Sequence, residues 1–80
     1  MKTALITGIT GQDGAYLARF LLKNDYNVYG TYRRSSTVDF WRINELGIND
    51  HKNLFLKELD LTDPSNISEL IRTIKPDEIY

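Results

Sequence analysis

The chain has 80 residues, of which 41% are hydrophobic and 26% charged, and its formal net charge at pH 7 is −1. This balance gives no broad electrostatic attraction to nucleic acid or to an anionic membrane surface. The sequence contains no cysteine and one histidine, so we expect neither disulfides nor a zinc-type metal site. The apolar runs are too short for a membrane span or a signal peptide. We therefore expect one small cytoplasmic domain without a metal and without a nucleic-acid or membrane partner.

Segments typical of strands and of helices alternate along the chain. The predicted strands are residues 3–7, 27–32, 53–59 and 77–80. The predicted helices are residues 15–23, 40–46 and 64–74. The first and third of these helices carry an apolar stripe at spacings of three and four residues. Two helix ends have a sequence signal, because Asp63 suits an N-cap before Pro64 and Gly47 suits a C-terminal cap.

This β-α-β-α-β-α-β order predicts an α/β fold with a parallel sheet and right-handed crossovers. It corresponds to the N-terminal half of a Rossmann-type sheet, with strand order 3-2-1 and a truncated fourth strand beside the first. We expect residues 1–80 to form a partial dinucleotide-binding domain. An incomplete fourth strand would leave a hydrophobic edge unpaired, so we expect the chain to form a homo-oligomer.

Three glycines follow the first predicted strand at intervals of three: Gly8, Gly11 and Gly14. In dinucleotide-binding folds the first glycine permits a sharp turn and the second lets the backbone approach a pyrophosphate. The third lets the following helix pack closely on the strand. The helix N-terminus then offers free N–H groups and partial positive charge to the phosphates. The alternative is a glycine-rich turn without a ligand, whereas a nucleoside-triphosphatase loop is excluded because its lysine is missing.

Two arginines and two serines begin the polar loop after the second predicted strand. In NAD-binding folds an acidic residue about 20 residues beyond the glycines binds the ribose 2′-hydroxyl. This chain has Arg33 and Arg34 there, and a guanidinium binds a 2′-phosphate through two charge-assisted hydrogen bonds. Ser35 and Ser36 add further donors. The loop favours NADP over NAD; the alternative is a solvated surface pair, and the sequence does not rank the two arginines.

Asp60 and Leu61 lie at the C-terminal end of the third predicted strand, where ligands gather in open α/β sheets. The Asp60 carboxylate could accept a hydrogen bond from an adenine amino group, with Leu61 against the ring. It could equally cap the following helix. Both roles of Asp60 stay open at this point.

The glycine loop contains the pair Gln12-Asp13. Most extended short-chain dehydrogenase/reductases carry a hydrophobic and an aromatic residue at these two positions. With this pair, with Arg33-Arg34-Ser35-Ser36 and with Asp60-Leu61-Thr62-Asp63, the sequence resembles the start of the GDP-mannose 4,6-dehydratase family. These enzymes belong to the extended short-chain dehydrogenase/reductases. The resemblance covers essentially the whole chain.

The resemblance implies an NADP-dependent nucleotide-sugar dehydratase, a lyase with GDP-mannose as substrate. Family enzymes oxidise the sugar at C4 by hydride transfer to NADP⁺, eliminate water across C5–C6 and return the hydride to C6. The residues implied to bind the cofactor are Gly8, Thr10, Gly11, Gln12, Asp13, Gly14, Arg33, Arg34, Ser35, Ser36, Asp60 and Leu61. The alternatives are a related nucleotide-sugar reductase or epimerase, and a non-catalytic dinucleotide-binding module.

No catalytic residue is expected within these 80 residues. In short-chain dehydrogenase-type enzymes the catalytic tyrosine is followed four residues later by lysine, and none of the five tyrosines here has a lysine at that position. The family's catalytic residues and its sugar-binding domain come after the fourth strand, so the substrate domain is expected to be absent. Phe40 and Trp41 are expected to pack a short helix rather than to stack on a base.

Overall fold

The computed structural model describes residues 1–33, 40–59 and 62–80. Some of the residues predicted to bind the cofactor lie outside these ranges, namely Arg34, Ser35, Ser36, Asp60 and Leu61. Across the ranges that are described, no helix is both long enough and apolar enough to cross a membrane.

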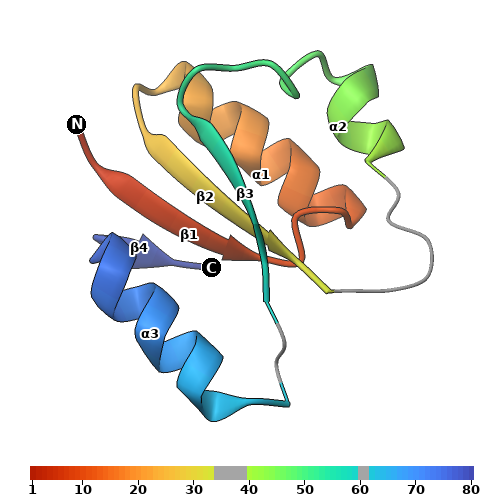
Figure 1. The fold of residues 1–80 in the computed structure, drawn as a ribbon. Coiled ribbons are helices and arrows are strands. Elements are labelled where there is room, and N and C mark those ends of the chain that lie inside the picture. Colours follow the sequence, from red (N-terminus) through yellow and green to blue (C-terminus); the bar gives the residue numbers. More distant parts are fainter. Residues whose placement is uncertain (34–39, 60–61) are drawn as a thin grey trace.

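Strands and helices alternate along the chain and form one parallel sheet with helices on both faces (Figure 1). The strands are β1 (Thr3–Thr7), β2 (Asn27–Tyr32), β3 (Leu54–Glu58) and β4 (Glu78–Ile79). The helices are α1 (Gln12–Lys23), α2 (Trp41–Glu45) and α3 (Pro64–Ile74). The strand order is β3-β2-β1-β4, and each pair of neighbours is parallel. The predicted α/β fold class and strand order are therefore confirmed.

The bounds of these elements agree with the predicted ones to within a residue, except at the start of α1. This helix begins at Gln12, three residues before the predicted start. Its first turn contains aspartate and glycine, which are poor helix formers, although Asp13 is favourable near the positive end of the helix dipole. Both predicted helix-end signals are present. The Asp63 side chain accepts a hydrogen bond from the Ser65 N–H at 3.0 Å, and Gly47 has a φ of 72° after α2.

The hydrophobic core lies between the sheet and the helices α1 and α2. Ala4 and Ile6 of β1 and Val28 of β2 point to this face and are buried. The helices contribute Ala15, Ala18, Leu21, Leu22 and Ile43 to the same cluster. The apolar stripe of α1 is therefore its core face, and α2 is held against the sheet by one fully buried isoleucine.

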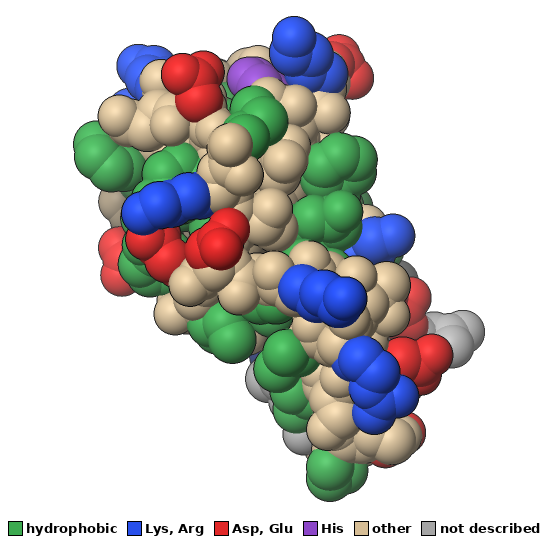
Figure 2. Space-filling view, turned by 90° about the vertical axis from the view of Figure 1, so that its left-hand side faces the viewer, with side chains coloured by type: hydrophobic (Ala, Val, Ile, Leu, Met, Phe, Trp, Pro, Cys, Tyr) green, Lys and Arg blue, Asp and Glu red, His purple; other side chains and the backbone are tan. Residues whose placement is uncertain are grey.

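The opposite face of the sheet carries α3, which covers it more loosely (Figure 1). None of residues 64–74, all of which are described, is buried. A cavity of about 420 Å³ separates α3 from β2 and β3, and Tyr29 and Leu70 are among its lining residues. Tyr29 stacks on Phe55 with ring centroids 4.8 Å apart. Figure 2 shows the side of the molecule with the N-terminus and α3, where exposed hydrophobic side chains lie among acidic and basic ones.

The short strand β4 pairs with β1, and its Glu78 side chain accepts two further hydrogen bonds. The Tyr26 hydroxyl donates to Glu78 Oε2 at 3.2 Å, and the Tyr80 hydroxyl donates to Oε1 at 2.8 Å. Burial and the hydrogen bond to Glu78 raise the pKa of Tyr26 above its ordinary value of 10.0. The hydrogen bond to Glu78, followed by burial, raises the pKa of Tyr80 in the same way. Both tyrosines therefore favour their neutral forms in the folded state.

Candidate functional site

The chain leaves β1 through a turn at Gly8, whose φ of 75° lies in the left-handed region that glycine adopts without strain. The next residue, Ile9, donates its N–H to the carbonyl oxygen of Thr31 at 3.0 Å, and its side chain is fully buried. That side chain needs a glycine opposite it, because a Cβ on Gly30 would lie 2.9 Å from the Ile9 Cβ. The glycine loop is thus anchored to the end of β2.

Gly14 lets α1 begin directly against this turn. A Cβ on Gly14 would lie 2.5 Å from the carbonyl oxygen of Gly8 and 3.0 Å from the Cα of Ile9. Both are backbone atoms, so neither can move aside without a shift of the turn itself. The first and third glycines therefore have the structural roles predicted for them, namely a sharp turn and close packing of helix on strand.

Gly11 is the exposed N-cap residue of α1. Its N–H donates to the carbonyl oxygen of Gly8 at 3.1 Å, and its own carbonyl oxygen accepts from the Ala15 N–H at 3.0 Å. A Cβ here would make one ordinary 3.4 Å contact, with the Gly8 oxygen. Packing within the described residues therefore does not require a glycine at this position. What the glycine does provide is close access to the backbone from outside.

The first turn of α1 is open to an anion. Its N-cap has no side-chain hydrogen bond, so within the described part of the chain no side-chain oxygen caps the first N–H groups of the helix. These groups and the helix dipole favour negative charge. Gln12 and Asp13 are exposed beside them, and their side-chain oxygens can accept hydrogen bonds from hydroxyl groups.

Arg33 lies at the same edge of the sheet as the glycine loop. Thr7 of β1 pairs with Thr31 of β2, so the segments that follow these two strands emerge side by side. Arg33 is exposed, and it forms no ion pair with any residue that the structure describes. The carbonyl oxygen of Tyr32 accepts from the Leu59 N–H at 2.9 Å, which brings the end of β3 to the same edge.

The structure therefore describes some of the residues predicted to bind the cofactor, but not all of them. Those brought to one edge of the sheet are Gly8, Thr10, Gly11, Gln12, Asp13, Gly14 and Arg33. The roles of the remaining ones, Arg34, Ser35, Ser36, Asp60 and Leu61, stay predictions because these residues lie outside the described ranges. Residues 1–33, 40–59 and 62–80 contain no cluster of three or more His, Cys, Asp or Glu side chains placed to hold a metal ion.

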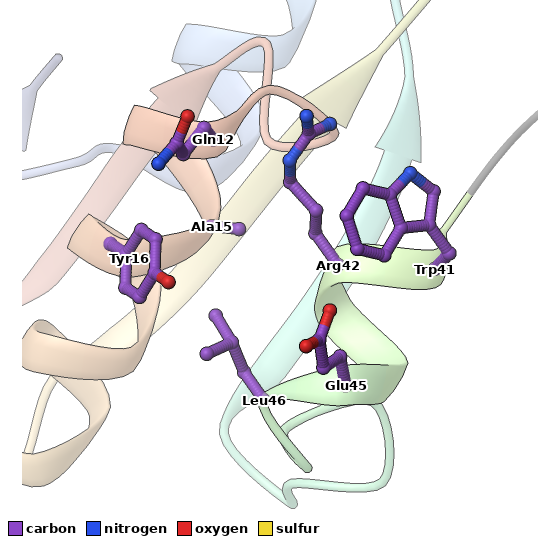
Figure 3. A pocket seen from close by; sticks show the side chains of 7 residues that line it. All are labelled: Gln12, Ala15, Tyr16, Trp41, Arg42, Glu45 and Leu46. Atoms are coloured by element: carbon purple, nitrogen blue, oxygen red, sulfur yellow. The ribbon is translucent and has the colours of Figure 1, made fainter.

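A cavity of about 260 Å³ lies beside the glycine loop, between α1 and α2 (Figure 3). Its lining residues are Gln12, Ala15, Tyr16, Trp41, Arg42, Glu45 and Leu46. The Arg42 side chain extends from α2 toward the loop, and its Nη1 donates to the carbonyl oxygen of Thr10 at 3.4 Å. No sequence signal pointed to Arg42, because this contact joins residues 32 positions apart.

The expectation that Trp41 packs the short helix is wrong. Trp41 is 49% exposed, and the Arg42 guanidinium carbon lies 4.6 Å from its ring centroid. The expectation that Phe40 packs the short helix is confirmed. Its ring packs against the core and meets the Tyr32 ring edge-on, with the two ring centroids 5.2 Å apart. A helix as short as α2 buries one narrow face, and Ile43 occupies it.

Residues 5–80 match the family model described as GDP-mannose 4,6 dehydratase. The chain belongs to the GDP-mannose 4,6-dehydratase family. It is 53% identical over 83 aligned residues to the GDP-mannose 4,6-dehydratase of Yersinia enterocolitica, covering 100% of this chain and 22% of that relative. It is 49% identical over 83 aligned residues to the human GDP-mannose 4,6 dehydratase, covering 99% of this chain and 22% of that relative. The chain thus spans 22% of the length of these two members of the family.

A solved structure supports the same fold for this member of the GDP-mannose 4,6-dehydratase family. The Bordetella bronchiseptica enzyme WbmH, in complex with NAD⁺, is similar to it with a TM-score of 0.80 and 32% identity. The match covers 99% of this chain and 24% of that chain. The fold of this chain is therefore shared with part of a larger enzyme.

Proposed function

We propose that this chain is the NADP(H)-binding N-terminal portion of a GDP-mannose 4,6-dehydratase. The observation that carries the proposal is the glycine turn, in which Gly8 meets a left-handed backbone conformation and Gly14 a packing constraint, whereas neither applies to Gly11. A glycine that packing does not require, exposed at an uncapped helix N-terminus, fits the close approach of a pyrophosphate. The similarity to an enzyme whose structure is a complex with NAD⁺ supports a nicotinamide dinucleotide as the ligand.

The proposed binding residues fall into three groups, as the resemblance implies. The groups are Gly8, Thr10, Gly11, Gln12, Asp13 and Gly14 for the pyrophosphate and neighbouring ribose, Arg33, Arg34, Ser35 and Ser36 for the 2′-phosphate, and Asp60 and Leu61 for adenine. The residues that the structure describes fit a dinucleotide cofactor of this kind. The loop leaves room against the backbone at Gly11, and the described acceptors and donors are on one edge of the sheet.

The proposed preference for NADP over NAD rests on Arg33 and Arg34, of which the structure describes Arg33. Its guanidinium is exposed at the end of β2, where NAD-binding folds place a carboxylate for the ribose 2′-hydroxyl. A positive charge there attracts a 2′-phosphate, and the planar fork can bind two of its oxygens. A carboxylate at the same place would repel it.

The bound cofactor would supply reversible hydride transfer to and from the sugar. The residues of this chain would bind its phosphates and its adenosine end, orient it across the sheet edge and take no part in proton transfer. We further propose GDP-mannose as the substrate, a homo-oligomeric assembly, a cytoplasmic location and no nucleic-acid or membrane partner.

Calorimetric titration tests the proposal most simply, using the product of the complete reading frame that encodes these residues. We expect NADPH to bind at least about tenfold more tightly than NADH, as one well-formed guanidinium–phosphate pair would give. Absence of binding, or equal binding of the two cofactors, would overturn it. Product analysis after incubation with GDP-mannose and NADP⁺ distinguishes a dehydratase from a reductase or an epimerase.

A further inference from the structure

The peptide unit between Thr10 and Gly11 is held at both ends. Its N–H donates to the carbonyl oxygen of Gly8 at 3.1 Å, and its carbonyl oxygen accepts from Arg42 Nη1 at 3.4 Å. The first hydrogen bond lies within the loop, whereas the second comes from a different helix. Together they fix the plane of the peptide immediately before the first turn of α1.

Arg42 is itself held in place by its neighbours on α2. Its guanidinium lies over the Trp41 ring at 4.6 Å from the centroid, a favourable cation–π arrangement. The adjacent Ile43 is fully buried in the core, so the backbone of α2 is fixed relative to the sheet. Figure 3 shows the Arg42 side chain beside the Trp41 ring, with its guanidinium at the level of the glycine loop.

We propose that Arg42 is a positioning residue for the glycine loop. Its side chain turns the Thr10 carbonyl away from a bound pyrophosphate, and the N–H groups of α1 stay directed at that pyrophosphate. This inference rests on the proposed function, because it concerns the same phosphate site. A carbonyl oxygen turned toward a phosphate would repel it, whereas an oriented N–H attracts it. Arg42 also carries a positive charge that no ion pair with a described residue neutralises, and this charge further favours an anion nearby.

The test compares Arg42→Met with Arg19→Met. Methionine keeps the apolar stem and removes the guanidinium. Arg19 is the matched control, because its guanidinium also lies over an aromatic ring, that of Tyr16 at 5.3 Å, and no hydrogen bond links it to the loop among the described residues. Calorimetry measures the Kd values of NADPH, NADH and ADP for each variant, and thermal unfolding checks the fold.

We expect Arg42→Met to raise all three Kd values by a similar factor, about threefold to tenfold, and Arg19→Met to leave them unchanged. Arg42→Lys restores a charge and a donor and should recover most of the affinity. If Arg42→Met does not fold, Trp41→Leu provides a milder change, which removes the ring beneath the guanidinium and should weaken all three ligands about twofold.

Three results would overturn the inference while leaving the proposed function intact. The first is unchanged Kd values with a lowered unfolding temperature, which would make Arg42 merely structural. The second is a loss confined to NADPH, which would place the guanidinium on the 2′-phosphate instead. The third is an equal loss in Arg19→Met, which would indicate a general effect of charge. Failure of the unsubstituted protein to bind any of the ligands would overturn the proposed function, and this inference with it.

Discussion

The carbonyl oxygen of Gly8 lies 2.5 Å from the position that a Cβ on Gly14 would occupy. The turn after β1 and the first turn of α1 therefore pack backbone against backbone. We expect Gly14→Ala to lower the free energy of unfolding by about 1–3 kcal/mol, the usual cost of overpacking, although alanine is the better helix former. Urea denaturation measures this difference, and an unchanged midpoint and slope would contradict the close packing.

Gly11→Ala is the matched substitution within the same loop. Its Cβ would make an ordinary 3.4 Å contact, so we expect a stability change of less than about 1 kcal/mol. The added methyl group should nevertheless keep a pyrophosphate from the backbone and weaken NADPH binding at least about tenfold. Undiminished affinity in a folded Gly11→Ala variant would mean that the ligand does not approach the loop there.

Arg33→Glu should remove the preference for NADPH. The substitution replaces an exposed positive charge at the end of β2 by a negative one. We expect NADPH affinity to fall about 10- to 100-fold while NADH affinity changes little, because NADH lacks the 2′-phosphate. Lys52→Glu, the same charge change in the turn before β3, serves as the control. An equal loss of NADH affinity in Arg33→Glu, or an equal loss of NADPH affinity in Lys52→Glu, would argue against a direct contact of Arg33 with the 2′-phosphate.

The hydrogen bonds that Tyr26 and Tyr80 donate to Glu78 of β4 should weaken in alkaline solution. The pKa values of Tyr26 and Tyr80 are raised in the folded chain, so their contribution to stability is fully present below pH 10.0. It is lost as the pH rises through their higher folded-state values, because the folded chain then holds phenolate groups beside the Glu78 carboxylate. Glu78→Gln should lower both pKa values toward 10.0, as measured by the ultraviolet absorbance of phenolate. Unchanged titration would show that the carboxylate does not affect these hydroxyls.

The parts of the site that were predicted from the sequence depend on local backbone demands. A left-handed turn at Gly8 and the absence of a Cβ at Gly14 are both conditions that favour glycine, and they occur at fixed offsets after a strand. The strand order was also predictable, because alternating strands and helices with right-handed crossovers leave few arrangements. Asp63 could be assigned as a cap because Pro64 follows it.

The parts that were missed depend on tertiary contacts. α1 begins at Gln12 although its first residues have low helix propensity, because the turn from β1 places them in the helix. Arg42 reaches Thr10 because Phe40 and Ile43 fix α2 against the core, and no spacing in the sequence indicates that distance. The exposure of Trp41 has the same origin, since the short helix buries its isoleucine instead.

Hydrogen–deuterium exchange with and without NADPH tests most directly whether the glycine loop binds the dinucleotide. We expect NADPH to slow exchange most in the segment of residues 8–16, and to protect the segment containing Arg33 more than NADH does. Protection at the cavity between β3 and α3 instead, or no protection of residues 8–16 at saturating NADPH, would contradict this expectation.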